Sequence, residues 1–189
     1  MVALVSVNGG VGRSTLVTAL SSGLQRLGES VVALDLDPQN ALRQHFGVDP
    51  ELLGVGRASL LNTRWETLLQ AGFAGCQVIP FGNTGIQQKD NLQGWLTREP
   101  KWLAQHLSTL GLSERQIMLI DTPAGDNVYL HQALSVADFV LVIVQPNAAC
   151  LGTLDQLDAV LAGYLERERP PQRLYVINQL DERSAFSLD

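Results

Sequence analysis

The chain has 189 residues, of which 46% are hydrophobic and 17% charged, so it can bury a sizeable core and is not disordered. Its net charge of −6 and pI of about 5.0 exclude a broad basic face for nucleic acid, though not a small local basic patch. No apolar run reaches the ~20 residues that span a bilayer, and no signal peptide opens the chain, so we expect a cytoplasmic protein.

Apolar runs rich in β-branched residues alternate with amphipathic stretches along the chain. They predict six strands, at residues 2–8, 30–37, 76–82, 116–123, 138–146 and 173–180. The stretches between them predict helices at residues 14–28, 39–47, 58–70, 95–112 (interrupted by Pro100), 129–136 and 149–167, and a surface loop at residues 82–94. This alternation indicates an α/β fold with a doubly wound, mostly parallel sheet.

No internal repeat, low-complexity tract or linker divides the sequence, so we expect one domain over residues 1–189. No closing helix is visible after the sixth strand, and we expect the natural protein to continue beyond Asp189. Cys76 and Cys150 lie far apart and fit free, buried thiols better than a zinc site. The three histidines are expected at surface or packing positions: His45, His106 and His131.

The stretch VNGGVGRST lies between the first strand and the first helix. A glycine-rich turn there directs backbone N–H groups at an anion, and the helix N-terminus adds partial positive charge. Gly9, Gly10 and Gly12 would let the backbone approach phosphates closely. Ser14 stands where a hydroxyl joins Mg²⁺, and Thr15 where one reaches the α-phosphate. The alternative for this loop alone is a tight turn without a ligand.

Carboxylates end two of the predicted strands. Asp35 and Asp37 end the second strand, and Asp121 ends the fourth. Since the carboxyl ends of strands in an open α/β sheet face the ligand crevice, we expect these side chains near the glycine-rich loop. Each could be an ordinary polar strand end, but their joint occurrence in this order favours a site for a magnesium-bound nucleotide.

The order of NGGVGRST, DLDPQN, LIDTPAG and VINQ resembles the deviant Walker A ATPases, the family of the partition and division-site ATPases ParA and MinD. Over nearly the whole chain, HQALSVAD, NAAC, IPFG and VIN resemble the BcsQ (YhjQ) group of cellulose synthase operon proteins. This resemblance implies a P-loop NTPase fold of the ParA/MinD (SIMIBI) type, ATP or ADP with Mg²⁺ as cofactors, and a nucleotide-dependent homodimer.

The resemblance also implies roles for individual residues. Asp37 would be the catalytic residue that orients the attacking water, and residues 121–125 would sense the γ-phosphate. Mg²⁺ would lie at Ser14, Asp37 and Asp121. The nucleotide would be bound by Asn8, Gly9, Gly10, Val11, Gly12, Arg13, Ser14 and Thr15 at its phosphates and by Asn178 at adenine.

Two residues depart from the family pattern Lys-Gly-Gly-x-Gly-Lys-Ser/Thr. Asn8 replaces the lysine that reaches across the dimer, and Arg13 replaces the lysine within the loop, where it can still bind two phosphate oxygens. We expect neither Lys89 nor Lys101, the chain's two lysines, to lie near the loop. Because a trans-acting charge is worth roughly 10³–10⁵ in the rate of phosphoryl transfer, nucleotide binding should survive while hydrolysis becomes slow or absent.

Three hypotheses of function remain. The first is an ATP-binding protein of the BcsQ type that supports cellulose biosynthesis or its polar localisation, with protein partners in a cellulose synthase complex. The second is an active ParA- or MinD-like ATPase that positions DNA or a membrane-bound complex; the acidic pI and missing lysines count against it. The third is an α/β domain that no longer binds nucleotide. Tryptophans could form a sugar platform, but we expect them to pack inside: Trp65, Trp95 and Trp102. No membrane span is expected, which leaves peripheral contact with the inner membrane through partners.

Overall fold

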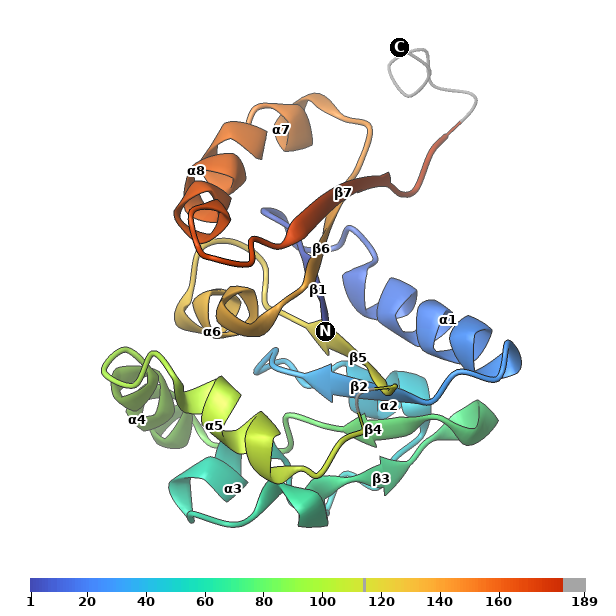
Figure 1. The fold of residues 1–189 in the computed structure, drawn as a ribbon, viewed down its shortest axis with the longest axis vertical. Coiled ribbons are helices and arrows are strands. Elements are labelled where there is room, and N and C mark those ends of the chain that lie inside the picture. The colour runs from blue at the N-terminus through green and yellow to red at the C-terminus, as the bar shows by residue number, and fades with distance from the viewer. Residues whose placement is uncertain (114, 182–189) are drawn as a thin grey trace.

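The computed structural model describes residues 1–113 and 115–181. In these residues seven strands form one sheet in the order β3-β4-β2-β5-β1-β6-β7, and all neighbouring pairs are parallel except β3–β4 (Figure 1). The strands are β1 (Val2–Val5), β2 (Val31–Asp35), β3 (Gln70–Ala71), β4 (Gln77–Ile79), β5 (Ile117–Asp121), β6 (Phe139–Val144) and β7 (Gln172–Ile177). The predicted α/β fold with a mostly parallel, doubly wound sheet is confirmed.

Helices cover both faces of this sheet (Figure 1). One face carries α1 (Arg13–Arg26) and α2 (Leu42–Phe46). The other carries α3 (Val55–Leu60), α4 (Ile86–Leu96), α5 (Trp102–Thr109), α6 (Val128–Val136) and α8 (Leu154–Leu165), with α7 (Ala148–Leu151) just before α8. Each face therefore has its own apolar core, as expected for a sheet whose strands are buried on both sides.

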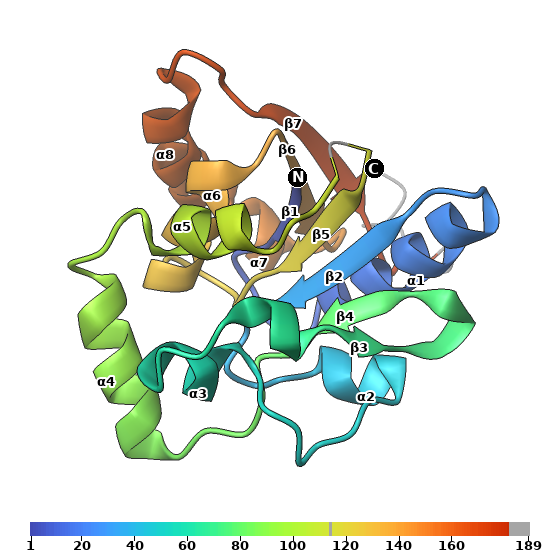
Figure 2. The same cartoon turned by 60° about the horizontal axis from the view of Figure 1, so that its bottom comes forward.

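The strand register brings two predicted carboxylates together. All five residues of β2 are buried, and its last residue, Asp35, is the register partner of Asp121 at the end of β5. Figure 2 shows the arrowheads of β2 and β5 pointing to the same edge of the sheet. The loop after β1 leaves this edge as well, because β1 pairs with β5 in parallel register.

The helix predicted at residues 58–70 is wrong in extent. α3 spans Val55–Leu60, a 3-10 helix follows at Trp65–Leu68, and Gln70 already belongs to β3. Asn62 adopts a positive φ of 51°, which ends the helical path. The sequence analysis also missed β3, which has two residues, too few for a periodic signal.

The loop predicted at residues 82–94 is also wrong, because α4 begins at Ile86. Its composition is polar because this helix buries a narrow stripe, with Leu92 and Leu96 below 2% exposed while Ile86 is 82% exposed. The predicted helix at 95–112 is correspondingly the end of α4 plus α5 on the two sides of Pro100. The helix predicted at 149–167 is two helices, α7 and α8.

The remaining packing predictions hold. Cys76 and Cys150 are buried free thiols. Trp65 and Trp102 are fully buried and pack edge to face with ring centroids 5.2 Å apart, and Trp95 is partly buried against the same core. None of the helices in the described part of the chain is long and apolar enough to cross a membrane. The expectation of a continuation after Asp189 concerns a terminus that lies outside the described residues.

Candidate functional site

The loop between β1 and α1 has the backbone that its glycines predict. Gly10 and Gly12 adopt φ angles of 77° and 86°, in the left-handed region that favours glycine. Gly12 is the N-cap residue of α1, so the N-terminus of this 14-residue helix opens at the loop. Exposed backbone N–H groups and a helix N-terminus together form an anion-binding arrangement.

The end of β7 holds this loop from the side. Asn178 Nδ2 donates to the carbonyl oxygen of Val11 at 2.8 Å, and Gln179 Nε2 donates to that of Gly10 at 3.0 Å. A Cβ atom at Gly12 would lie 2.5 Å from Asn178 Nδ2. The φ angle therefore favours glycine at position 12, and a side chain there would also displace the Asn178 amide from Val11.

The loop lines the wall of a cavity of about 870 Å³ at the carboxyl edge of the sheet. Its opposite wall comes from the segment after β2, the segment after β5 and one face of α4. Its lining comprises Gly9, Gly10, Val11, Gly12, Arg13, Ser14, Thr15, Asp37, Pro38, Gln39, Ala41, His45, Ile86, Lys89, Asp90, Gln93, Pro123, Ala124, Asn127, Tyr129 and Gln179. The volume is in the range of small-molecule sites.

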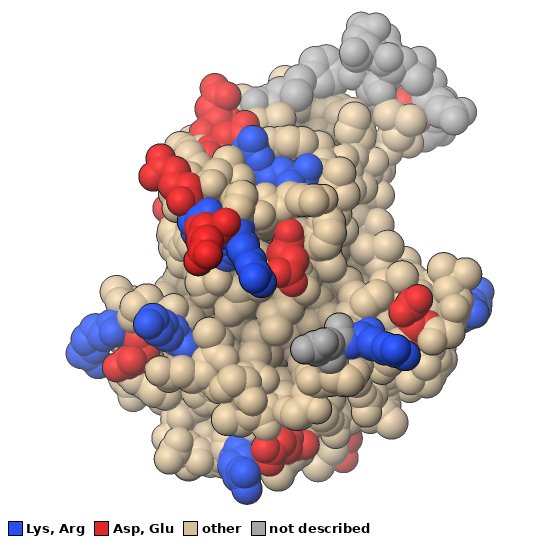
Figure 3. All heavy atoms as spheres, in the orientation of Figure 1, with Lys and Arg blue, Asp and Glu red and all other residues tan. Residues whose placement is uncertain are grey.

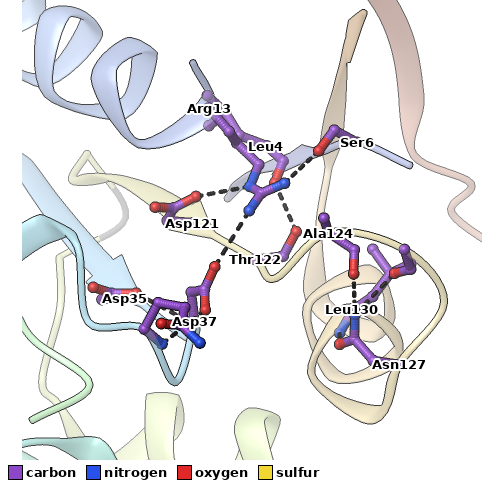
Figure 4. A network of polar contacts seen from close by, with 12 residues as sticks. Leu4, Ser6, Arg13, Asp35, Asp37, Asp121, Thr122, Ala124, Asn127 and Leu130 are labelled. Atoms are coloured by element: carbon purple, nitrogen blue, oxygen red, sulfur yellow. Dashed lines mark hydrogen bonds and ion pairs between the residues drawn. The ribbon is translucent and has the colours of Figure 1, made fainter. Parts of the chain in front are cut away.

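Arg13 is held on the carboxylates of the site (Figure 4). Its Nε donates to Asp121 Oδ1 at 3.0 Å, and its second terminal nitrogen donates to Asp37 Oδ2 at 3.3 Å. Its other terminal nitrogen donates to the hydroxyl of Ser6. The side chain is 8% exposed, so this is a buried ion-pair cluster that joins α1, β5 and the segment after β2.

Burial dominates the electrostatics of the two strand-end carboxyls. It raises the pKa of Asp121, whereas Arg13 and the Ser14 hydroxyl pull that pKa back down. Burial and the neighbouring Asp121 raise the pKa of Asp35 well above its usual range. Asp35 also accepts the backbone N–H groups of Asp37 and Leu42, so it shapes the turn that presents Asp37 to the cavity.

Asn8 lies apart from this cluster. Its Nδ2 donates to the sulfur of Cys150 and the hydroxyl of Thr153, both at 3.4 Å. Its side chain is thus directed toward α7 and α8, and it is absent from the lining of the cavity. Of the residues predicted to bind nucleotide, those from Gly9 to Thr15 line the cavity, whereas Asn8 of the loop and Asn178, the predicted adenine contact, do not.

Two of the three residues predicted at Mg²⁺, Ser14 and Asp121, suit a hydrated ion, whereas Asp37 is ion-paired with Arg13. Asp121 Oδ2 is buried and has no hydrogen-bond partner among the described residues, and the Ser14 hydroxyl lies beside this carboxyl. No group of three or more His, Cys, Asp or Glu residues in residues 1–113 and 115–181 could hold a metal by itself. Mg²⁺ commonly uses one or two carboxylates together with waters and substrate phosphates, so these donors fit that ion only together with a phosphate ligand.

Both lysines were expected away from the loop, and Lys89 lies on α4, in the opposite wall of the same cavity. This residue lines the cavity together with residues 9–15, and its Nζ donates to the carbonyl oxygen of Pro38 at 2.9 Å. Lys89 could not be placed from the sequence because it lies in the polar stretch of residues 82–94, which predicts a loop rather than α4. The spacing of Ile86, Lys89, Asp90 and Gln93 on one helical face is the signal that could have found it.

Comparison with known sequences indicates one family. The sequence model described as "Cellulose biosynthesis protein BcsQ" matches residues 1–188. The cellulose biosynthesis protein BcsQ of Escherichia coli (strain K12) is 38% identical over 149 residues, which cover 78% of this chain and 59% of that protein. The chain therefore spans about three fifths of the length of this curated relative.

Solved structures share the fold. Cobyrinic acid a,c-diamide synthase from Mycobacterium smegmatis, with a bound ATP analogue and magnesium, superposes with a TM-score of 0.84 at 21% identity, over 100% of this chain and 78% of that one. The septum site-determining protein MinD from Pyrococcus horikoshii OT3, complexed with Mg-ADP, gives a TM-score of 0.78 at 22% identity, over 98% and 72% of the two chains.

Proposed function

Because this chain belongs to the family of the cellulose biosynthesis protein BcsQ, we propose that it binds ATP or ADP with Mg²⁺ and supports bacterial cellulose biosynthesis with weak or no hydrolysis. The observation that carries this proposal is the loop of residues 9–15, which lines a large cavity at the same sheet edge as Asp37 and Asp121. Solved relatives with this fold bind ADP or an ATP analogue with magnesium.

In this proposal the phosphates lie against the loop and the N-terminus of α1. The backbone N–H groups of the loop and the helix dipole would stabilise their negative charge. Ser14 and Asp121 would hold Mg²⁺, which would neutralise phosphate charge when bound. Asn178 is the proposed adenine contact; its Nδ2 already donates to Val11, which leaves its Oδ1 for the base.

Two features support slow hydrolysis. Asn8 carries no charge and is directed toward α7 and α8, so no cation at this position can meet charge that develops on the γ-phosphate. Asp37, the proposed catalytic residue, is ion-paired with Arg13. A carboxylate in this pair is less available to orient water, whereas the backbone contacts that would bind phosphate are unaffected.

The proposal includes a nucleotide-dependent homodimer that acts with protein partners of a cellulose synthase complex, including in its polar localisation. DNA is not the proposed partner. On the face in Figure 3, basic and acidic side chains lie intermixed, without the broad basic surface that DNA binding needs. This arrangement supports the first of the three hypotheses over a DNA-positioning ATPase.

The test combines binding, mass and turnover. Calorimetry with Mg-ATP and Mg-ADP should show one site per chain, and light scattering with Mg-ATP should show a dimer. Phosphate release at saturating Mg-ATP should stay well below the ~1 s⁻¹ of ordinary enzymes. Absence of nucleotide binding would overturn the whole proposal, whereas tight binding with rapid release of phosphate would overturn only the claim of slow hydrolysis.

A further inference from the structure

A second cavity, of about 500 Å³, adjoins the first. It lies between α2, α3 and the start of α4, three elements that Figure 2 shows on the near side of the molecule. Its lining comprises Pro38, Gln39, Asn40, Arg43, Arg57, Gly82, Asn83, Thr84, Gly85, Gln88 and Lys89. None of these residues is acidic, although the chain as a whole carries a net charge of −6.

Three cations line this cavity, and in the described part of the chain no carboxylate pairs with any of them. Arg43 donates to the side-chain oxygen of Asn83 at 3.0 Å, and Lys89 donates to the carbonyl oxygen of Pro38 at 2.9 Å. Arg57 is exposed, and its side chain makes no hydrogen bond or ion pair within residues 1–113 and 115–181. The cavity is therefore a local basic site on an acidic protein.

A buried polar side chain in the cavity wall lacks a partner. Asn40 is 5% exposed, and its Oδ1 accepts the backbone N–H of Gly82 at 3.1 Å. Its Nδ2 is buried and has no hydrogen-bond partner among the described residues, and the same is true of Thr84 Oγ1. A buried donor without a partner is destabilising, so an acceptor in this cavity would satisfy both groups.

The backbone of the wall also suits an anion. Gly82, at a φ of 83°, is in close contact with Gly54, which fixes the loop of residues 82–85 against the segment before α3. This loop leads from β4 into α4, so the N-terminus of an 11-residue helix opens here. The N-terminal N–H groups of a helix favour negative charge.

We propose that this second cavity is a binding site for the phosphate group of a small molecule. Two arginines and a lysine match the charge of a phosphate, arginine can bind two of its oxygens at once, and Asn40 and Thr84 supply further donors. The site is distinct from the proposed nucleotide site but shares Pro38, Gln39 and Lys89 with it. Since Pro38 follows Asp37, an occupant would fix the segment that presents Asp37 to the larger cavity.

The test is an amide NMR titration of the full chain with inorganic phosphate, with chloride added to equal ionic strength in a parallel series. Amides of residues 82–85 report the second cavity, and amides of residues 9–15 report the first. We expect saturable shifts at residues 82–85 with a dissociation constant of about 1 mM or lower. Glycerol 3-phosphate should shift the same amides. A site that accepts only free phosphate would exclude this larger molecule and show no such shifts.

Two double variants form a matched comparison. Arg43→Ala with Arg57→Ala should weaken phosphate binding at residues 82–85 at least about ten-fold, because it removes two charged donors. Arg26→Ala with Arg98→Ala changes the net charge equally through two exposed arginines outside the cavity and should leave the affinity unchanged. Thr84→Val removes only a hydroxyl and should weaken binding by a few-fold, and retained amide dispersion shows that each variant is folded.

Three outcomes would overturn the proposal. One is the absence of saturable shifts at residues 82–85 at roughly 50 mM phosphate, where a site of millimolar affinity would be filled. A second is equal weakening by the two double variants, which would indicate general charge attraction. The third is a response to an acidic peptide such as hexaglutamate without any to phosphate, which would indicate a protein-docking surface. Shifts confined to residues 9–15 would support the nucleotide site and still overturn this one.

Discussion

Arg13 and Arg57 line neighbouring cavities at the same edge of the sheet, and their surroundings differ. Arg13 is 8% exposed and donates to Asp37, Asp121 and Ser6. Arg57 is exposed, and its side chain has no polar partner in the described part of the chain. The arginine of the glycine-rich loop is thus held by carboxylates, while the side chain of Arg57 is held by no group of the described chain.

This difference shows that a charge's place in a motif does not fix its role. Arg13 is buried beside two carboxylates and supplies the positive charge that balances theirs. It has this role whatever the loop binds. An exposed arginine such as Arg57 compensates no buried carboxylate, so its side chain can contact a group that enters the cavity. The experiments below separate structural cations from ligand-binding cations.

The largest effect is expected from Gly12→Val, which should abolish nucleotide binding. Valine is disfavoured at a φ of 86°, and its Cβ would displace Asn178 from the loop. Nucleotide binding should therefore be lost for two reasons: the loop is distorted, and the valine side chain enters the space for phosphate. Calorimetry with Mg-ADP is the measurement. Gly23→Ala in the middle of α1, where a Cβ meets nothing within 4 Å, should bind nucleotide normally.

Arg13→Ala should lower the free energy of unfolding by about 3–5 kcal/mol, because it leaves Asp121 buried without its counter-charge. Urea unfolding measures this change. The control is Arg173→Ala, which breaks a partly solvent-exposed ion pair to Asp158 and should cost less than about 1 kcal/mol. Equal losses in the two variants would show that the buried pair of Arg13 and Asp121 stabilises the fold no more than a partly exposed pair does.

The double change Asn8→Lys with Arg13→Lys should raise the rate of ATP hydrolysis about ten-fold or more. Lysine at position 8 adds a mobile cation. Lysine at position 13 has one compact ammonium group in place of a forked guanidinium, so it cannot pair with both Asp37 and Asp121, and Asp37 becomes available to orient water. Phosphate release at saturating Mg-ATP is the assay, with both single variants alongside because neighbouring changes need not add. An unchanged rate in the double variant would show that the lost lysines do not limit turnover.

The smallest effect is expected from Lys89→Ala, which should weaken Mg-ADP binding roughly five-fold, because a partly exposed charge at the cavity wall is screened by water. The chain's other lysine, Lys101, lines neither cavity, so Lys101→Ala should leave the affinity for Mg-ADP unchanged. Because the two variants alter net charge identically, any difference in affinity between them reports position rather than overall charge.

The sequence was sufficient for the backbone of the site. A glycine-rich turn after a buried strand and aspartates at strand ends obey rules of parallel sheets that require no tertiary detail. This is why Gly12, Asp37 and Asp121 were expected at one sheet edge, where the structure has them.

The direction of side chains could not be obtained in this way. Whether Arg13 extends to a phosphate or folds back on Asp121 depends on competing partners from three segments, and Ser6 among them carries no motif. Lys89 and the second cavity were missed for a different reason. Leu92 and Leu96 form the buried stripe of α4. In the sequence, Leu92 falls in the polar stretch that predicts a loop and Leu96 in the stretch that predicts the next helix, so the helical period of α4 is divided between the two.

The contact between Asn178 and the glycine-rich loop has a consequence for folding during synthesis. The donor Asn178 lies 167 residues after the acceptor Val11. At a synthesis rate of 5–20 residues per second, roughly 8–30 s pass between the emergence of the loop and that of the residue that holds it. During this interval the glycine-rich segment has no lateral support on the ribosome. The contacts of Asn178 and Gln179 with the loop can form only when the end of β7 has been synthesised.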